Sequence, residues 1–383
     1  MKVLYFMNHV DSGGAALALY DLIKELKESC PDVKAIVITG CHNQLNEAFS
    51  KIGIENYSAP FKNFSGSYRQ PKFLWKSILQ IRYRISKPTA IKKIEKLIDF
   101  TTIDIIHSNL NRIDIGYYFA QKYRIKHLWH IREHGDDDFL LMPVFSSYNP
   151  ILTDSSSTFI AISKSVKSKW LSLGIPEQNI RLIYDGIGTS HWTKNETIVK
   201  KSKLSFIFLG GYHVNKGQEI FIQALSLLPK NIKDDILVHF FGNGSIGYKK
   251  KLERLIQKKK LNKFCNLYDY NPDIYKTLSQ YHIGVNCSKA EGFGRITVEY
   301  MMAGLCPLVS NTGANVEIID NQINGLMFDR DNLFDIMDKI IFLYTNRDFI
   351  TDFSKKATKK AISSFSMKAH AQLIYDLYKQ NLN

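Results

Sequence analysis

Two glutamates near the end of the chain stand on either side of a glycine turn. Glu291 precedes this turn, and Glu299 follows in a stretch with helical character. The turn consists of Gly292, Phe293 and Gly294. The strand-like segment 282–288 comes directly before it. A strand, a glycine turn and a helix start form an anion cradle, because free backbone N–H groups and the positive helix end point at one place.

A carboxylate beside such a cradle has an unusual electrostatic position. It opposes a bound phosphate unless it accepts hydrogen bonds from hydroxyl groups, so Glu291 and Glu299 favour a ligand that carries both a diphosphate and sugars. A nucleotide sugar is such a ligand. The alternative is that the two glutamates bind no ligand, since two glutamates eight positions apart occur by chance and an acidic first turn caps many helices.

Length and composition limit the possible classes of protein. The chain has 383 residues, of which 45% are hydrophobic and 12% aromatic, which predicts two or three folded domains. Its five cysteines are scattered and form no CxxC pair, which favours a reducing cytoplasm and gives no sign of a thiolate metal site. The apolar run at 1–7 is too short for a signal peptide, and no apolar stretch is long enough to span a membrane.

The net charge of +15 is unevenly distributed. Between Lys62 and Lys96 there are ten Lys or Arg and one acidic residue, and between Lys249 and Lys263 eight against one. Without a zinc finger or an RNA-binding aromatic motif, these runs do not predict nucleic-acid binding.

In the first run, apolar residues at helical spacing stand beside Trp75 and are surrounded by cations, which predicts a helix that binds an anionic membrane surface. These apolar residues are Leu74, Ile78, Ile81 and Ile85, and the cations are Lys72, Lys76, Arg82 and Arg84. The alternative is that the apolar stripe packs on a sheet and the lysines face water.

Strands and helices alternate in two halves of the chain. Continuous apolar runs predict buried strands, and such alternation predicts α/β domains with parallel sheets, which bind ligands at the carboxyl ends of their strands. The expected strands are 3–7, 35–39, 103–107, 126–131, 159–162, 204–209, 236–241 and 306–310, and the expected helices include 15–27 and 218–228. We place the hinge at 185–203, which is rich in Gly, Thr, Lys and Asn.

Over its whole length the chain resembles the retaining GT-B glycosyltransferases of family 4, also called group 1. The matching segments are Ser12-Gly13-Gly14-Ala15, Leu209-Gly210-Gly211 with Lys216-Gly217, Ser288 with the two glutamates, Asn311-Thr312-Gly313-Ala314 with Glu317, and Asn324-Gly325-Leu326. The resemblance implies two Rossmann-like domains around a central cleft: an acceptor-side domain at 1–187 and a nucleotide-sugar domain at 188–365. A last helix at about 366–383 is expected to pack back onto the first domain.

The resemblance also implies roles for individual residues. The catalytic residues are expected to be Glu291, Lys216, Arg132 and His130. The donor is expected to contact Gly14, Gly210, Lys216, Asp269, Tyr270, Ser288, Gly292, Phe293, Gly294, Arg295 and Glu299. No metal and no cofactor are expected. The expected donor is a UDP-sugar in preference to a GDP- or dTDP-sugar, the acceptor is lipid-linked or a glycan, and the expected location is cytoplasmic, at the inner face of the plasma membrane. Whether the protein forms an oligomer is left open by the resemblance.

Two positions depart from the family pattern. Where the resemblance implies an arginine for the diphosphate, the chain has Gly211, and a bidentate contact is lost. Where it implies a strand-end histidine that touches the donor sugar, the best register gives Arg132, with His130 and His134 on the same face of an extended strand. These departures keep an alternative function open, namely a nucleotide-sugar-binding or partner protein with impaired catalysis.

Three other kinds of motif, for dinucleotide binding, metal binding and hydrolysis, are weaker than the glycosyltransferase pattern. The GxGxxG run at 242–247 resembles a dinucleotide fingerprint but has no convincing acidic partner downstream, so we expect it to line the donor cleft. The acidic run 136–138 and the pair His130 and His134 are weak metal motifs, because the first is an ordinary solvated loop and the second lacks a third ligand. Ser12 and Ser288 have no paired base that would indicate a hydrolase.

Overall fold

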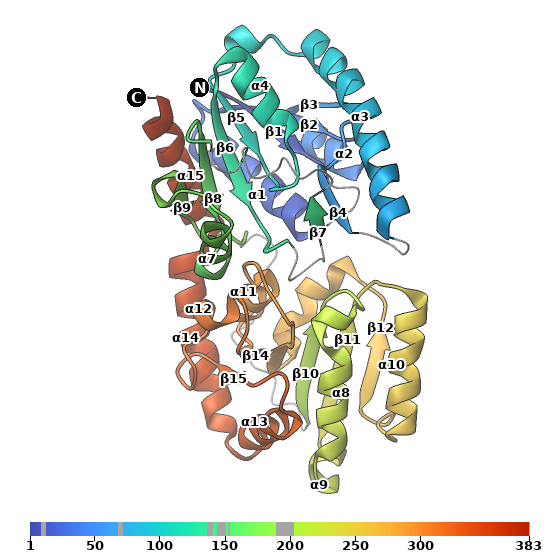
Figure 1. Cartoon of the computed structure of the whole chain (residues 1–383). Coiled ribbons are helices and arrows are strands. Elements are labelled where there is room, and N and C mark those ends of the chain that lie inside the picture. The colour runs from blue at the N-terminus through green and yellow to red at the C-terminus, as the bar shows by residue number, and fades with distance from the viewer. Residues whose placement is uncertain are drawn as a thin grey trace. The chain divides into compact units, whose positions relative to one another are not determined.

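The computed structural model describes residues 1–8, 13–67, 72–135, 141–143, 151, 154–188 and 203–382. Four features considered above therefore fall wholly or partly outside the described residues: Ser12, positions 68–71 of the basic run with the side chain of Lys72, the acidic run 136–138, and most of the proposed hinge. The chain forms two compact units (Figure 1). The first comprises Met1–Gly186 and Met367–Asn383, and the second comprises Ile187–Ser366.

The first unit contains a seven-stranded parallel sheet in the order β3-β2-β1-β5-β6-β8-β9. Its strands are β1 (Lys2–Met7), β2 (Lys34–Thr39), β3 (Glu55–Ser58), β5 (Ile105–Ser108), β6 (Lys126–Ile131), β8 (Ser157–Ala161) and β9 (Ile180–Leu182). A separate antiparallel pair joins β4 (Ser65–Ser67) to β7 (Leu141–Pro143).

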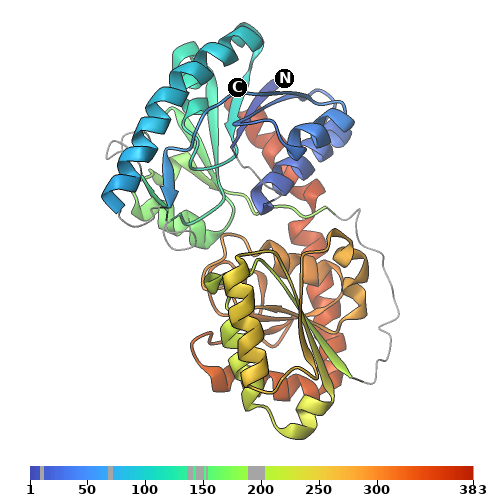
Figure 2. The same cartoon turned by 90° about the vertical axis from the view of Figure 1, so that its right-hand side faces the viewer.

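Helices flank the first sheet. They are α1 (Gly14–Ser29), α2 (Gln44–Lys51), α3 (Lys72–Leu97), α4 (Ile115–Tyr123), α7 (Lys164–Ser172) and α15 (Met367–Leu382), with short 3-10 turns η1 (Phe100–Thr102) and η3 (Glu177–Asn179). The last helix, α15, packs beside α1 (Figure 2), although more than 300 residues separate them in the chain. The hydroxyl groups of Tyr5 on β1 and Tyr378 on α15 are 2.8 Å apart in the core.

The second unit contains a six-stranded parallel sheet in the order β12-β11-β10-β13-β14-β15. Its strands are β10 (Leu204–Leu209), β11 (Ile236–Phe241), β12 (Cys265–Tyr268), β13 (Ile283–Asn286), β14 (Cys306–Ser310) and β15 (Leu326–Phe328). Its α-helices are α8 (Gln218–Leu227), α9 (Lys230–Asp234), α10 (Ile246–Lys258), α11 (Arg295–Met302), α12 (Asn315–Ile318), α13 (Leu333–Thr345) and α14 (Arg347–Phe365). The 3-10 turns are η4 (Val214–Lys216) and η5 (Pro272–Gln280).

Both sheets confirm the predicted α/β class, and each has its own apolar core. The central strands are continuous apolar runs because helices cover both of their faces. Every residue of β10 is buried, and so is every residue of β1 after Lys2. Gly284 on β13 lies against the ring of Tyr300, where an added Cβ would come within 2.2 Å of the ring. This glycine lets α11 lie close to the strand.

Helix α3 contradicts the alternative expectation for the basic segment, in which its apolar stripe packs on the sheet. Its apolar stripe does not pack on the sheet: Leu74, Ile81 and Ile85 are 57%, 56% and 68% exposed. Among the described residues, no helix combines the length and the apolar character needed to cross a bilayer.

Candidate active site

The second sheet reverses its strand order between β10 and β13. From β10 the chain adds β11 and β12 on one side, and from β13 it adds β14 and β15 on the other. Open parallel sheets bind ligands at the carboxyl ends of their strands, in the crevice at such a reversal. The segments that leave β10 and β13 are therefore the expected ligand-binding segments of this unit.

These two segments meet at Lys216 and Glu291. Lys216 is the last residue of η4, and Glu291 lies five residues after the end of β13. The Lys216 ammonium donates a hydrogen bond to Glu291 Oε1 at 2.8 Å, and the Ser288 hydroxyl donates to the same oxygen at 2.5 Å. The side chain of Lys216 is 37% exposed and that of Glu291 is 13% exposed. Three of the residues expected from the sequence thus form one cluster, and its cation is accessible.

Glycines let the two segments approach each other closely. Gly217 has φ +77°, and a Cβ there would lie 2.1 Å from the carbonyl oxygen of Cys287. Nearby, the Lys289 N–H donates to the Asn215 carbonyl at 2.8 Å. Gly210, where the first segment begins, has φ +155°. Only glycine adopts these backbone angles without strain, so the two glycines determine how Lys216 reaches Glu291.

The glycine turn after Glu291 leads into α11. Gly294 is the N-cap residue with φ +79°, and no side chain caps the helix from this position. The positive end of the helix therefore lies at the turn. Phe293 is only 4% exposed and packs edge-on against Phe365, with ring centroids 5.6 Å apart. Its side chain belongs to the core, and only its backbone can contribute to an anion cradle.

Glu299 lies one turn into α11 and is 4% exposed. Arg295 Nε donates to Glu299 Oε1 at 3.0 Å. Burial and, after it, the Glu299 carboxylate raise the pKa of Tyr270 and of Tyr275. Glu299 on α11 and Tyr270 in the loop after β12 are therefore close enough to interact.

The loop after β12 holds two residues expected to bind the nucleotide. Asp269 is ion-paired with Lys249 at 2.6 Å, and its side chain is 80% exposed. The Tyr270 N–H donates to Asn243 Oδ1 at 3.2 Å, and Tyr270 is 43% exposed. Asp269 is thus directed at the surface, whereas Tyr270 is held between the loop after β11 and Glu299.

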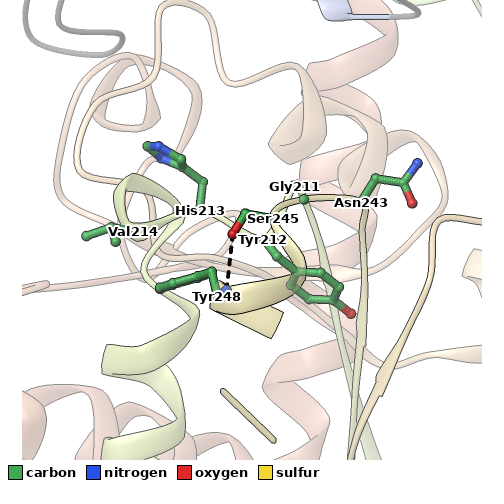
Figure 3. A pocket seen from close by; sticks show the side chains of 8 residues that line it. Gly211, Tyr212, His213, Val214, Asn243, Ser245 and Tyr248 are labelled. Atoms are coloured by element: carbon green, nitrogen blue, oxygen red, sulfur yellow. Dashed lines mark hydrogen bonds between the residues drawn. The ribbon is translucent and has the colours of Figure 1, made fainter. Parts of the chain in front are cut away.

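A cavity of about 380 Å³ opens at the carboxyl ends of β10 and β11 (Figure 3). Its lining comes from the loops after these strands and from the start of α10, and consists of Gly211, Tyr212, His213, Val214, Asn243, Gly244, Ser245 and Tyr248. The Tyr248 N–H donates to Ser245 Oγ at 3.2 Å, which caps α10 at the wall of the cavity (Figure 3). The position of the cavity matches the edge at which a parallel sheet binds its ligands.

The first two glycines of the GxGxxG run serve the packing of this loop. A Cβ at Gly242 would lie 2.1 Å from the carbonyl oxygen of Gly210, and one at Gly244 would lie 2.5 Å from that of Tyr212. The two loops also form a β-bridge between Tyr212 and Gly244. Close backbone contact therefore explains Gly242 and Gly244 without a dinucleotide site, whereas a Cβ at Gly247 would come no closer than 3.7 Å to Ser245 Oγ, so packing does not require that glycine.

The loop after β14 fixes Glu291 from a third direction. The hydroxyl groups of Ser310 and Thr312 both donate to the Ser288 carbonyl, at 2.8 and 2.7 Å. The Ala314 N–H donates to the Glu291 carbonyl at 3.0 Å. Gly313 has φ +55°, and a Cβ there would lie 2.5 Å from the Glu291 nitrogen. The segment 311–314, expected only as part of a family pattern, holds the backbone that carries Glu291.

The first sheet has the same kind of reversal, between β1 and β5. Helix α1 begins at Gly14, and Gly13 before it is the N-cap residue. Asn109, which follows β5, donates from Nδ2 to the Ala15 carbonyl at 3.0 Å. Asn109 Oδ1 in turn accepts from Arg132 Nε at 2.9 Å. Asn109 therefore connects Arg132 to the start of α1, one residue from Gly14.

Arg132 is directed into the first unit. Its NH1 group donates to both carboxylate oxygens of Asp185, at 2.6 and 2.7 Å, and NH2 lies 3.3 Å from His130 Nδ1. Arg132 is 7% exposed and Asp185 is equally buried. The strand-end arginine is thus held in a buried ion pair within this unit.

His130 lies in a buried polar cluster with this ion pair. Its Nδ1 is 3.2 Å from His107 Nε2, and His107 Nδ1 is 2.7 Å from the Tyr378 hydroxyl. Burial and then the Arg132 charge lower the pKa of His130, so its imidazole is neutral. Ring atoms of His130 and His370 and a carboxylate oxygen of Asp185 lie within 4.8 Å of one another. A metal ion is disfavoured there, because Arg132 already places a positive charge on the same carboxylate.

The sequence pattern assigned no role to Asp185, to His370 or to Ser310, the last residue of β14. Asp185 gave one usable signal, since a carboxylate shortly after a strand stands at the edge where parallel sheets bind ligands. His370 gave none, because it lies on α15, far along the chain from His130. His134, the other histidine considered for the family role, is buried beside the Ser165 hydroxyl, with Nε2 at 3.2 Å.

Known proteins resemble the chain over nearly its whole length. Residues 12–191 match the model of glycosyltransferase family 4, and residues 192–360 match that of group 1 glycosyl transferases. An uncharacterized glycosyltransferase of Methanocaldococcus jannaschii is 25% identical over 342 residues, which are 88% of this chain and 86% of the relative. The capsular polysaccharide biosynthesis glycosyltransferase CapH of Staphylococcus aureus is 23% identical over 327 residues, 83% of each chain.

The fold is also that of a solved structure. The crystal structure of Anabaena HepE in complex with UDP-glucose matches with a TM-score of 0.79 at 18% identity, covering 99% of this chain and 100% of HepE. The group 1 match spans the entire cluster around Lys216 and Glu291. The chain is accordingly a glycosyltransferase of the group 1 type with the GT-B fold.

Proposed function

We propose that this protein is a retaining glycosyltransferase that moves a sugar from a UDP-sugar to a hydroxyl group of a lipid-linked or glycan acceptor. The observation that supports this most strongly is the cluster of Lys216, Glu291 and Ser288 at the reversal of the second sheet. It places an accessible cation, a hydrogen-bond-accepting carboxylate and a helix start in one loop system. These are the groups that a sugar diphosphate requires.

Lys216 and the start of α11 stabilise the leaving diphosphate. As the bond between the anomeric carbon and the phosphate oxygen breaks, negative charge grows on the diphosphate, and fixed positive charge then acts most strongly. Lys216 is the accessible ammonium of the cluster, and Gly294 leaves the helix start open. Arg295, paired with Glu299, is a second cation at the same helix end.

Two carboxylates hold the hydroxyl groups of the donor. Glu291 accepts from the transferred sugar, since it lies beside the cradle and its position is fixed by Ser288 and by the loop after β14. Glu299 accepts from the ribose, and Tyr270 beside it contacts the base. Each charged hydrogen bond of this kind contributes about 1.5–3 kcal/mol.

The proposed transfer proceeds on one face of the sugar. The anomeric carbon exchanges its bond to the phosphate oxygen for one to the acceptor oxygen, and the departing phosphate takes the acceptor's proton. In the proposed reaction Glu291 binds hydroxyl groups of the sugar through hydrogen bonds and forms no covalent bond to the anomeric carbon. The configuration at the anomeric carbon is therefore retained without a glycosyl-enzyme intermediate.

The relatives support the choice of donor and pathway. HepE was crystallised with UDP-glucose, and CapH takes part in capsular polysaccharide biosynthesis. We accordingly place the reaction in cell-surface polysaccharide or glycan synthesis, in the cytoplasm at the inner face of the plasma membrane, with no metal or cofactor required.

A second candidate function is nucleotide-sugar binding with impaired catalysis. It is favoured by Gly211, which gives no cation to the diphosphate, and by Arg132, whose guanidinium is bound to Asp185. Lys216 is then the main cation for the leaving group, and catalysis depends on whether it suffices.

One experiment separates the two functions. The full chain is incubated with radiolabelled UDP-, GDP- and dTDP-sugars and extracted lipid acceptors, and the anomeric configuration of the product is read by NMR. We expect transfer from a UDP-sugar with retention, and loss of turnover in Lys216→Met that exceeds its loss of UDP affinity. Lys356→Met, on α14, is the matched control. Donor binding without transfer to any acceptor supports the second function, and an inverted product contradicts the proposed mechanism.

A further inference from the structure

Helix α3 presents an apolar row to solvent. Leu74, Ile78, Ile81 and Ile85, here called the outer row, recur at intervals of four, three and four residues. This spacing keeps side chains on one face of an α-helix. Ile78 is partly buried, and the other three are more than half exposed. Figure 1 and Figure 2 show α3 at the periphery of the first unit.

The opposite face of α3 fixes the orientation of this row. Tyr83, Lys87, Ala90 and Ile94 follow the same spacing, and Ala90 and Ile94 are fully buried. The Asp114 carboxylate on the neighbouring loop accepts from the Tyr83 hydroxyl and, at 2.6 Å, from the Lys87 ammonium. This face therefore anchors the helix to the first unit, and the outer row faces away from it.

The charged residues that α3 carries between Leu74 and Lys93 are all positive. Arg82 and Arg84 follow Ile81 on either flank of the row, and both are exposed. Lys92 and Lys96 continue the line of the row toward the end of the helix and are exposed as well. The first acidic residue of α3 is Glu95. An apolar strip bordered by cations of this kind complements a surface that is apolar inside and negative outside.

We propose that the outer row of α3 docks the protein onto the surface of an anionic lipid bilayer. The apolar side chains enter the boundary between headgroups and acyl chains, and the flanking cations bind lipid phosphates. A protein partner fits less well, because the centres of protein interfaces are depleted of lysine and the charged residues of proteins carry both signs. The whole chain, at +15, is attracted to the same surface.

This docking does not depend on the proposed function, because the outer row lies on the first unit and Lys216 and Glu291 lie on the second. It would bring the enzyme to a lipid-linked acceptor. Failure to dock would leave the transfer reaction intact with a water-soluble acceptor, whereas failure of transfer would leave vesicle binding intact. The two proposals therefore fail separately.

Co-sedimentation of the full chain with vesicles tests the proposal. Phosphatidylcholine vesicles with and without phosphatidylglycerol are compared over a series of salt concentrations. We expect binding only with phosphatidylglycerol, and weaker binding as salt rises. The triple variants Leu74→Asn/Ile81→Asn/Ile85→Asn and Arg82→Gln/Lys92→Gln/Lys96→Gln are each expected to bind at least about tenfold more weakly.

Matched controls change exposed residues of the second unit. Lys355→Gln/Lys356→Gln/Lys359→Gln removes the same charge from α14, and Ile323→Asn/Ile362→Asn removes exposed apolar side chains; both are expected to bind like the wild type. The proposal is overturned if the wild type pellets equally with both vesicle types, or with neither. It is also overturned if the Leu74→Asn/Ile81→Asn/Ile85→Asn variant binds normally, or converts a dimer to a monomer without affecting vesicle binding.

Discussion

The Lys216 ammonium lies 2.8 Å from Glu291 Oε1, so the cation proposed for the diphosphate is paired with the carboxylate proposed for the sugar. The pair joins the two segments that leave the reversal of the second sheet. A diphosphate that binds Lys216 competes with Glu291 for the same ammonium. In the proposed binding mode, the donor exchanges one ion pair for another, and Glu291 becomes available to the sugar hydroxyl groups.

The first prediction follows from this exchange. Glu291→Gln should lower kcat strongly but should not weaken UDP binding, because it removes the competitor for Lys216. The pair is partly exposed, so the gain in UDP affinity should not exceed about fivefold, which corresponds to about 1 kcal/mol. Isothermal titration with UDP and steady-state kinetics measure the two effects. Asp352→Asn, which breaks an exposed pair with Lys356 on α14, is the control. A weaker affinity for UDP in Glu291→Gln would show that the carboxylate does not compete with the diphosphate.

The second prediction concerns the contact between Gly313 and Glu291. Gly313→Ala puts a Cβ 2.5 Å from the Glu291 nitrogen, which must displace the backbone that carries the carboxylate. Gly304 also has a positive φ, but a Cβ there would meet no atom of the described residues within 4 Å, so Gly304→Ala introduces the backbone strain alone. We expect kcat/KM to fall at least about tenfold, or about 1.4 kcal/mol, beyond the effect of Gly304→Ala. Equal kinetics in the two variants would mean that this loop does not position Glu291.

The strands that the sequence predicted are the interior strands of the two sheets. The four at the edges, β3, β9, β12 and β15, were not predicted as strands. Interior strands are buried on both faces and are therefore continuous apolar runs, whereas an edge strand has fewer neighbours and tolerates polar residues. β3 has the sequence Glu-Asn-Tyr-Ser and no fully buried residue, and β9 and β15 are three residues long. Their pairing comes from the sheet and not from a local pattern.

The candidate site divides in the same way. The site around Glu291 could be predicted because a strand, a glycine turn and a helix start are close together in the sequence, whereas Lys216 and Ser288 were expected only from the family resemblance. The cluster around Arg132 could not, because its partner Asp185 is 53 residues away and His370 lies on the last helix. In the sequence, a histidine such as His370 on the buried face of a helix cannot be distinguished from a histidine that only packs in the core. Only the packing of α15 onto the first unit brings it to Asp185.

The third prediction concerns the buried pair of Arg132 and Asp185. Asp185→Asn leaves the guanidinium buried without its counter-charge, which should destabilise the first unit by about 3–5 kcal/mol. Arg132→Met/Asp185→Asn removes both charges and should cost less than Asp185→Asn alone. Trp129 and Trp170 are buried in this unit, so tryptophan fluorescence during urea unfolding reports on it. Asp376→Asn, at an exposed position on α15, should change the stability by less than about 0.5 kcal/mol. A double variant less stable than Asp185→Asn would contradict the charge argument.

The fourth prediction is a loss of stability in mild acid. Burial lowers the pKa of four histidines in the first unit from the ordinary 6.5, and brings that of His127 to about 3. The others are His107, His130 and His370. Below pH 6.5 the unfolded chain binds protons that the folded unit does not, so stability is complete above pH 6.5 and falls as the pH is lowered. Each such histidine contributes a slope of about 1.4 kcal/mol per pH unit.

The contribution of a single histidine to this slope can be measured. His127 lies between the hydroxyl groups of Ser108 and Ser157, at 2.9 and 2.8 Å, and His127→Gln keeps a polar group there that does not titrate. Urea unfolding of this variant between pH 7.5 and 5 measures how the free energy of unfolding changes with pH. At the acid end this slope should be smaller than in the wild type by about 1.4 kcal/mol per pH unit, which corresponds to about one proton fewer bound on unfolding. His42→Gln, which replaces an exposed histidine of the same unit, is the control. If His127→Gln has the wild-type slope, His127 is not kept neutral by burial, because a neutral histidine must cost stability wherever the unfolded chain is protonated.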